Sequence, residues 1–321
     1  MAENILEIKD LVIEYHTDAA IVHAVSGVTL NVKKGETLGL VGETGAGKTT
    51  IARSILRILP TPPAKFRSGQ IIFDGEDLTT KSESEMRKIR GNRISMIFQD
   101  PMTALNPIET VGWQIAEAVK LHNDVTSAQA ERRACDMLEV VGIPMERYAE
   151  YPHQFSGGMK QRVIIAMALA CNPELLLADE PTTALDVTIQ AQVLKMMQDL
   201  KEDMGTSVIL ITHDLGVVAS SCQSVAVIYA GEIVEYGTVE HIFDFPSHPY
   251  TNGLFDSLPR LKTTERRLKP ISGLMPDPTF LPEGCRFYDR CPDASEECGA
   301  KPPDVFEIAP GHLVKCLKAK G

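Results

Sequence analysis

The apolar residues of the chain occur in two patterns that alternate along much of its length. Short unbroken apolar runs, which are typical of strands buried in a sheet, cover residues 37–41, 93–98, 174–178 and 207–212. Helical repeats follow residue 48 and residue 156 and cover residues 187–204, with Gly205 as the expected C-cap. Strands that alternate with helices in this way predict an α/β fold.

Two segments near the N-terminus have a different pattern. Residues 5–15 and 22–32 are rich in β-branched residues and alternate locally between apolar and polar positions, which predicts antiparallel strands. A further strand is expected over residues 68–73, ending in the turn signal Asp74-Gly75. The fold should therefore contain an antiparallel β region in addition to the α/β core.

The second half of the chain changes character twice. Residues from about 106 to 171 have a mostly helical pattern and are expected to form an inserted helical subdomain. From residue 259 onward the chain holds nine of its twenty prolines and four of its seven cysteines. We therefore predict a main domain over residues 1–258 and a Cys-rich, loop-rich C-terminal extension over residues 259–321.

Composition and charge narrow the range of functions. A chain of 321 residues can bury a sizeable core, and a net charge of −11 argues against a broad nucleic-acid interface. The N-terminus lacks the basic and apolar regions of a signal peptide, and no apolar run approaches the about 18 residues that a membrane helix needs. We expect a cytosolic protein whose membrane role, if it has one, comes through a partner.

The strongest chemical signal is the stretch Gly-Glu-Thr-Gly-Ala-Gly-Lys-Thr-Thr, which fits the pattern G-x-x-x-x-G-K-[ST] between a strand and a helix. The glycines let backbone N–H groups point at phosphate oxygens, Lys48 would reach the β- and γ-phosphates, and the Thr49 hydroxyl would ligate Mg²⁺. The alternative is a glycine-rich turn before an ordinary helix. The predicted phosphate-binding residues are Gly42, Glu43, Thr44, Gly45, Ala46, Gly47, Lys48, Thr49 and Thr50.

An aromatic residue close to such a loop could stack on a nucleotide base. Tyr15, at the end of the first predicted strand, is the best candidate, and His16 is a lesser one. The alternative for Tyr15 is a tyrosine that packs on the core at the end of its strand.

Polar residues stand at the ends of three predicted buried strands, where side chains reach the crevice beyond a sheet. Gln99 could contact a metal ion or an attacking water, although a glutamine there is usually an ordinary loop residue. Asp179 would hold the Mg²⁺ shell and Glu180 would polarise the water, unless these two acids only form a solvated turn. His213 could contact a γ-phosphate, although a lone histidine is more often structural.

A second anion site is expected at the start of the helix that follows Phe155. Ser156 is a natural N-cap, and Gly157 and Gly158 leave the first N–H groups of the helix uncovered. A plain capped helix is the alternative, but glycine at those positions costs stability without any gain in packing.

Taken in order and spacing, these motifs and Ala184-Leu185-Asp186 resemble the nucleotide-binding domain of ABC-type ATPases over roughly residues 4–258. The stretch from Phe155 to Met159 stands where the family usually has Leu-Ser-Gly-Gly-Gln, and we expect this departure to affect affinity more than mechanism. The resemblance implies ATP and Mg²⁺ as cofactors and ATP hydrolysis as the activity. It also implies that two domains clasp two ATP molecules head to tail, so that the helix start at Ser156, Gly157 and Gly158 would cap the γ-phosphate held by a facing subunit. Met159 and Asp186 are further expected nucleotide-binding residues.

The segment Ser247-His-Pro-Tyr-Thr251 and the C-terminal extension are similar to the ATPase subunits of dipeptide and oligopeptide importers, a group that includes nickel and opine relatives. That likeness implies a second ATPase subunit, often a non-identical homologue, and two membrane-spanning permease subunits. It also implies an extracytoplasmic solute-binding protein as an indirect partner. The expected location is the cytoplasmic face of the inner membrane.

Four cysteines, Cys285, Cys291, Cys298 and Cys316, are concentrated in the extension. A reducing compartment disfavours disulfides, and zinc usually binds more closely spaced pairs. We predict a [4Fe–4S] cluster, with zinc and unligated thiols as alternatives. The remaining cysteines, Cys135, Cys171 and Cys222, are expected in the core.

Two further function classes compete with peptide import. One is a soluble ABC-type ATPase that acts on nucleic acid or ribosomes, although the coiled coils, basic linkers and tandem domains usual in such proteins are not visible. The other is an ATP-dependent metal or cluster handler with the cysteines as its cargo site.

Overall fold

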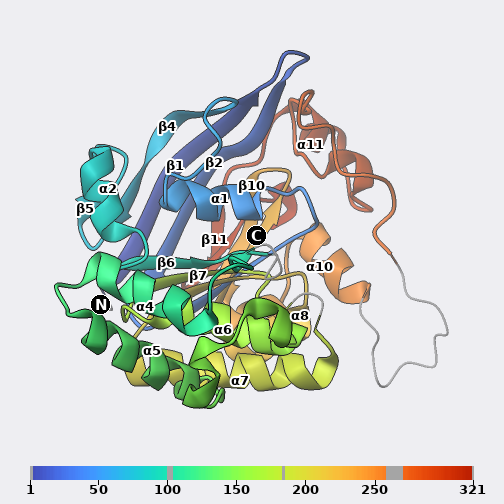
Figure 1. Ribbon diagram of the computed structural model, residues 1–321. Coiled ribbons are helices and arrows are strands. Elements are labelled where there is room, and N and C mark those ends of the chain that lie inside the picture. Colours follow the sequence, from blue (N-terminus) through green and yellow to red (C-terminus); the bar gives the residue numbers. More distant parts are fainter. Residues whose placement is uncertain (1–2, 100–103, 183–184, 258–269, 320–321) are drawn as a thin grey trace. The chain divides into compact units, whose positions relative to one another are not determined.

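The computed structural model describes residues 3–99, 104–182, 185–257 and 270–319 (Figure 1). The chain divides into two compact units. Unit 1 comprises residues 1–6, 31–37 and 72–212, and unit 2 comprises residues 7–30, 38–71 and 213–321. The predicted boundary after residue 258 lies among residues outside the described part, so the two-domain division stays a prediction.

Unit 1 contains three parallel strands that follow the predicted buried runs. They are β6 (Ile94–Ile97), β7 (Leu175–Asp179) and β8 (Ser207–Ile211). Ile94 pairs with Leu175, and Leu175 pairs with Ser207. Every residue of these strands is buried, as expected for parallel strands covered on both faces. The prediction of an α/β fold is confirmed.

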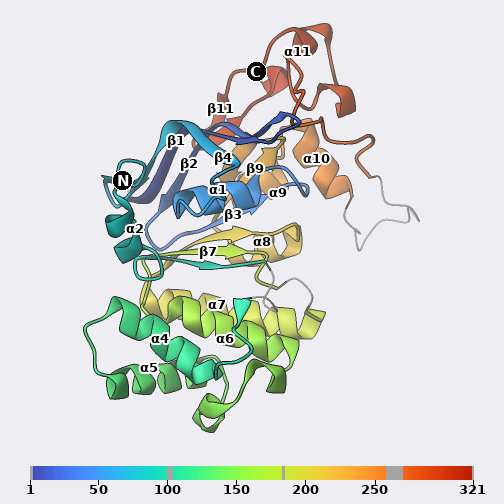
Figure 2. The ribbon, with the colours of Figure 1, turned by 45° about the horizontal axis from the view of Figure 1, so that its top comes forward.

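Four helices of unit 1 lie together on one side of β6 and β7 (Figure 2). They are α4 (Val111–His122), α5 (Ser127–Val140), α6 (Gly157–Leu169) and α7 (Val187–Met204). The predicted bounds of α7 are confirmed: Asp186 accepts a hydrogen bond from the N–H of Ile189, and Gly205 closes the helix with a φ of 66°. The helical pattern predicted for residues 106–171 is also confirmed.

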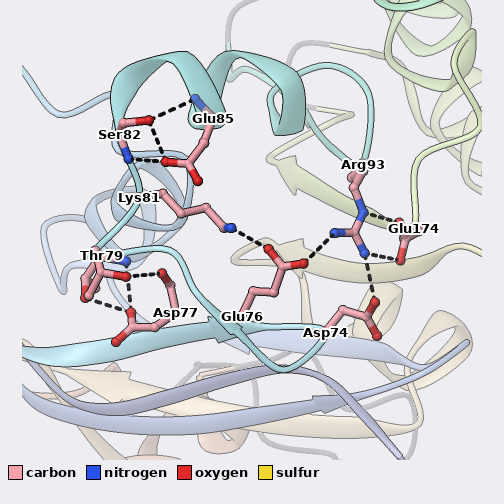
Figure 3. Close-up of polar contacts among 10 residues, drawn as sticks. Asp74, Glu76, Asp77, Thr79, Lys81, Ser82, Glu85, Arg93 and Glu174 are labelled. Carbon is pink, nitrogen blue, oxygen red and sulfur yellow. Dashed lines mark hydrogen bonds and ion pairs between the residues drawn. The ribbon is translucent and has the colours of Figure 1, made fainter.

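A polar network fixes the hairpin of unit 1 that joins the end of β4 (Ala64–Phe73) to β5 (Glu76–Asp77) (Figure 3). Arg93, just before β6, donates to Glu174 at 2.5 and 3.1 Å and to Asp74 at 2.8 Å. Glu174 stands just before β7, so one guanidinium holds the hairpin to the starts of two parallel strands. Lys81 pairs with Glu76, and Ser82 and Glu85 form a capping box on α2 (Glu83–Ile89).

Unit 2 is built on a second set of strands, of which only β3 (Thr37–Val41) was predicted as a buried run. Val41 of β3 pairs in parallel with Val227 of β9 (Ser224–Tyr229), and β10 (Glu232–Thr238) runs antiparallel to β9. The predicted N-terminal strands are confirmed as β1 (Asn4–His16) and β2 (Ile21–Lys33). The helices of this unit are α1 (Lys48–Ile55), α8 (Leu215–Ser221), α9 (Val239–Asp244), α10 (Pro249–Asp256) and α11 (Glu296–Ala300).

The C-terminal extension is more regular than its composition suggests. Its strands β11 (Phe306–Ala309) and β12 (His312–Val314) form a hairpin, and β12 pairs with β10. The carboxylate of Glu235 on β10 is fully buried and accepts hydrogen bonds from His312 Nε2 at 2.8 Å and from the backbone N–H groups of Ser247 and His248. This one carboxylate therefore joins the extension to the segment Ser247–Thr251.

His248 generates a prediction about pH. Its side chain is 1% exposed, its Nδ1 accepts from the N–H of Tyr250, and burial lowers its pKa to about 3. In the unfolded chain the group titrates near pH 6.5, so below that pH the unfolded state binds more protons than the folded state. Stability should therefore fall as pH drops from about 6.5 towards 3, by up to about 1.4 kcal/mol per pH unit from this residue.

Urea unfolding of His248→Asn between pH 7 and pH 5 measures this effect. The variant should lose stability less steeply with falling pH than the parent. His153→Asn, at an exposed histidine, is the matched control and should keep the parental slope. An unchanged slope in His248→Asn would contradict the assignment.

Candidate functional site

The loop between β3 and α1 has a shape that only glycine permits at two positions. Gly42 has a φ of 157°, and a Cβ there would lie 2.2 Å from the carbonyl oxygen of Ile228. Gly47 has a φ of 107°, and a Cβ there would lie 2.6 Å from the carbonyl oxygen of Ala24. Neighbouring backbone therefore presses on both ends of the loop and fixes its path.

The donors of this loop suit a phosphate group. The N-cap of α1 is Gly47, which has no side chain to cover the first N–H groups of the helix. Lys48 is 7% exposed, and its ammonium donates to the carbonyl oxygens of Gly42 at 2.7 Å and Glu43 at 2.9 Å. A buried ammonium at a helix N-terminus that presents uncovered N–H groups is the donor set that a polyphosphate requires, so ATP fits these residues.

Tyr15 lies close to the loop in unit 2. Its hydroxyl is 3.3 Å from Oγ1 of Thr50 on α1, which places the ring close to the loop as a base-stacking residue would require. The lesser candidate, His16, instead hydrogen bonds Glu14 at 2.8 Å. The geometry favours Tyr15, whose role stays a prediction.

The carboxylates predicted to serve catalysis lie in unit 1 at the end of β7. Asp179 is 1% exposed, and Glu180 follows it with a φ of 49°, a conformation uncommon for a residue with a side chain. The N–H of Glu180 donates to the carbonyl of Ile211, and its side chain accepts a hydrogen bond from Gln99 at 3.1 Å. The structure therefore brings Gln99 and Glu180 together, although 81 residues separate them.

The serine and glycines of the second predicted anion site begin α6. Ser156 accepts from the N–H of Met159 at 3.4 Å, Gly157 has open space where a side chain would stand, and Gly158 faces Ile189. Arg147 links the two positions that depart from the usual family sequence: its guanidinium lies 4.3 Å from the ring centroid of Phe155 and donates to the sulfur of Met159. Sequence reasoning did not identify Arg147, because nothing local marks it as a contact of this motif.

The two remaining predicted residues, His213 and Asp186, lie at the ends of secondary-structure elements. His213 follows β8, is exposed and belongs to unit 2, while Asp214 caps α8. Asp186 caps α7, whereas Thr183 and Ala184 of the same motif lie outside the described residues.

The prediction of a [4Fe–4S] cluster is wrong on the present structure. In the described part of the chain, no group of three or more histidine, cysteine, aspartate or glutamate residues is arranged to hold a metal ion. The four cysteines line one small cavity with His248 and Phe287, and burial raises the pKa of the Cys285 thiol to about 11. The physical reason for the error is that the extension obtains its order from the pairing of β12 with β10 and from Glu235. Of the other cysteines, Cys222 is buried as predicted, whereas Cys135 and Cys171 are half-buried.

Among the described residues, no helix is both long enough and apolar enough to cross a membrane.

Two family profiles match the chain. The profile of the ABC transporter family matches residues 25–183, and that of the oligopeptide/dipeptide transporter C-terminal region matches residues 234–298. The first match includes the loop at residues 42–50 and the carboxylates at the end of β7, and the second includes the segment Ser247–Thr251.

Several known proteins are similar over nearly the whole chain. A probable peptide ABC transporter ATP-binding protein of Sinorhizobium fredii is 52% identical, with 99% of this chain and 96% of the relative covered. The oligopeptide transport ATP-binding protein OppD of Bacillus subtilis is 51% identical, with 97% and 88% covered. Among solved structures, a dimeric ATP-binding cassette in a post-hydrolysis state, bound to ADP and Pi, is 28% identical with a TM-score of 0.66, and the match covers 73% of this chain and 98% of that one.

The close approach at Gly42 generates a prediction about stability. Gly42→Ala would place a methyl group against the Ile228 carbonyl and should lower the free energy of unfolding by roughly 2 kcal/mol or more. Gly157→Ala is the control, since its added methyl meets open space and should leave that free energy within about 0.5 kcal/mol of the parent. Thermal or urea unfolding measures both, and equal effects would contradict the packing argument.

Proposed function

The chain belongs to the family of ATP-binding proteins of oligopeptide and dipeptide ABC transporters, and from this premise we propose that it hydrolyses ATP to energise import of di- or oligopeptides. The observation that carries the proposal is its likeness to peptide transport ATP-binding proteins over 97–99% of its length. These relatives favour peptide import over nickel or opine import, over a soluble ATPase that acts on nucleic acid or ribosomes, and over a cluster handler.

We propose that unit 2 holds the nucleotide. The N–H groups from Gly42 to Thr50 and the Lys48 ammonium bind the phosphates, and Tyr15 stacks on the base. When ATP arrives, the Lys48 ammonium exchanges its hydrogen bonds to the Gly42 and Glu43 carbonyls for bonds to phosphate oxygens. Thr49 would supply the hydroxyl ligand to Mg²⁺, whose charge offsets the charge that builds up on the phosphates during hydrolysis.

The residues of unit 1 at the end of β7 would carry out hydrolysis. Asp179 would hold the Mg²⁺ shell, and Glu180 would polarise the attacking water. We expect Gln99, which donates a hydrogen bond to Glu180, to contact Mg²⁺ or the attacking water. His213, which belongs to unit 2, would contact the γ-phosphate. Preorganised groups of this kind act by positioning and by neutralising charge.

We also propose that the chain works as one of two ATPase subunits. The uncovered N–H groups at the start of α6, with Ser156, Gly157, Gly158, Met159 and Asp186, complete the site of the facing subunit. The second subunit is a non-identical homologue. Two permease subunits span the membrane, an extracytoplasmic binding protein delivers the solute, and this chain lies peripherally on the cytoplasmic face.

The assignment of Glu180 is tested by Glu180→Gln. The amide keeps the shape and the contact with Gln99 but is a far weaker base, so hydrolysis should fall at least about 100-fold while ATP binding persists. Glu139→Gln, at an exposed glutamate on α5, is the control and should hydrolyse ATP normally. A Glu180→Gln variant that turns over at close to the parental rate would show that Glu180 is not the catalytic base.

The role of α6 predicts that the isolated chain is a poor ATPase, since its own Ser156 would serve only a facing subunit. Activity per chain should rise with protein concentration and on addition of the partner ATPase. The measurement is a dilution series in which mass and turnover are followed together. Full turnover by a strictly monomeric preparation would contradict action across subunits.

A further inference from the structure

Glu43, the second residue of the phosphate-binding loop, forms an ion pair with an arginine of the C-terminal extension. Arg290 donates from Nη1 to Glu43 Oε2 at 2.6 Å and from Nη2 to Oε1 at 2.9 Å, across 247 residues of sequence. The Arg290 side chain is 5% exposed and that of Glu43 is 30% exposed, so the guanidinium is buried while the carboxylate stays partly open to solvent.

The guanidinium is itself held in place by the rest of unit 2. Its Nε donates to the carbonyl of Ser272 at 2.9 Å, and its Nη1 also lies 3.3 Å from the hydroxyl of Tyr229. Its central carbon lies 5.7 Å from the ring centroid of Tyr229 and 5.9 Å from that of Phe287. The hydrogen bond to Glu43 raises the pKa of Arg290, whose guanidinium is positively charged in any case.

The backbone of Glu43 is held as firmly as its side chain. Its N–H donates to the hydroxyl of Tyr250 at 2.9 Å, and its carbonyl accepts from Lys48 at 2.9 Å. Tyr250 is fully buried, and its ring lies 4.6 Å from that of Tyr229 and 5.4 Å from that of Phe287. One residue thus connects the extension and the Ser247–Thr251 segment to the lysine of the loop.

A carboxylate in a phosphate-binding loop should weaken the binding of an anionic ligand. The ligand of that loop carries several negative charges, and an uncompensated Glu43 would repel them. The two-bond pair with Arg290 cancels the charge and also keeps the carboxylate turned towards the extension.

We propose that Arg290 is a positioning residue for ATP binding, which neutralises Glu43 and so makes nucleotide affinity depend on the C-terminal extension. This inference rests on the proposed function, because it takes the loop to bind a nucleotide. It assigns the extension a task at the ATP site that neither the sequence motifs nor the relatives' names indicate.

The test is a double-mutant cycle on the full chain, with equilibrium binding of Mg–ATP as the readout. Arg290→Ala should weaken binding by on the order of ten-fold, the effect of one uncompensated charge near a polyphosphate at partly screened distance. The loss should diminish at high salt. In the Glu43→Gln background the same Arg290→Ala change should weaken Mg–ATP binding by less than about three-fold, because no carboxylate remains to repel the nucleotide. Arg290→Lys keeps the charge without the two-bond geometry and should lie between parent and Arg290→Ala.

Arg286→Ala is the matched control. Arg286 is an arginine of the same segment that is anchored to Glu232 and to the carbonyl of Ala230 instead of to Glu43. Its loss should leave ATP affinity within about two-fold of the parent if charge compensation at Glu43 is what matters.

Three outcomes would overturn the inference. One is an Arg290→Ala variant with parental affinity, and another is an equal loss with and without the Glu43 carboxylate, which would indicate only a loosened extension. The third is an equal loss in Arg286→Ala. In each case the parent still binds ATP and the proposed function stands, whereas a parent that binds no ATP contradicts the proposed function and this inference with it.

Discussion

A phosphate-binding loop has to leave its N–H groups uncovered and still hold one shape, so it cannot stabilise itself and depends on what presses on it from outside. In unit 2 that support begins with the parallel pairing of β3 and β9, which brings the carbonyl of Ile228 against Gly42. The carbonyl of Ala24 bounds the loop at Gly47, and the hydroxyl of Tyr250 takes the N–H of Glu43. The uncovered donors near Lys48 are rigid because the backbone around them is already paired or confined.

A buried carboxylate, Glu235, joins parts of unit 2 that lie far apart in the sequence. The Glu235 carboxylate accepts hydrogen bonds from two backbone N–H groups before α10 and from the His312 ring on β12. A buried charge is costly unless it is paired and hydrogen-bonded, so the three donors must be present together. The extension is thus joined to β10 through Glu235 and to the loop through Arg290.

Features that depend on residues close together in the chain, such as buried strands and helix ends, were predicted correctly from the sequence. The unbroken apolar runs gave β6, β7 and β8, and Asp186 and Gly205 marked the ends of α7, because strand burial and helix caps are local properties. The predicted strand and helix on either side of the loop at residues 42–50 are found as β3 and α1 for the same reason. The pairing of β12 with β10, the contact of Arg147 with Phe155 and the pair of Arg290 with Glu43 were not predicted, since polar partners many residues apart leave no periodic signal. The cysteine hypothesis failed at this point: it assumed a segment unable to order itself, whereas long-range pairing supplies the order.

The pair of Glu43 and Arg290 raises the question of why a charge stands in the loop at all. Buried ion pairs are often no more stabilising than apolar pairs of the same size, so stability alone does not account for it. Removing one partner, however, leaves a charge that acts directly on an anionic ligand, which an apolar pair could not do. The carboxylate therefore makes the loop sensitive to whether the extension is docked.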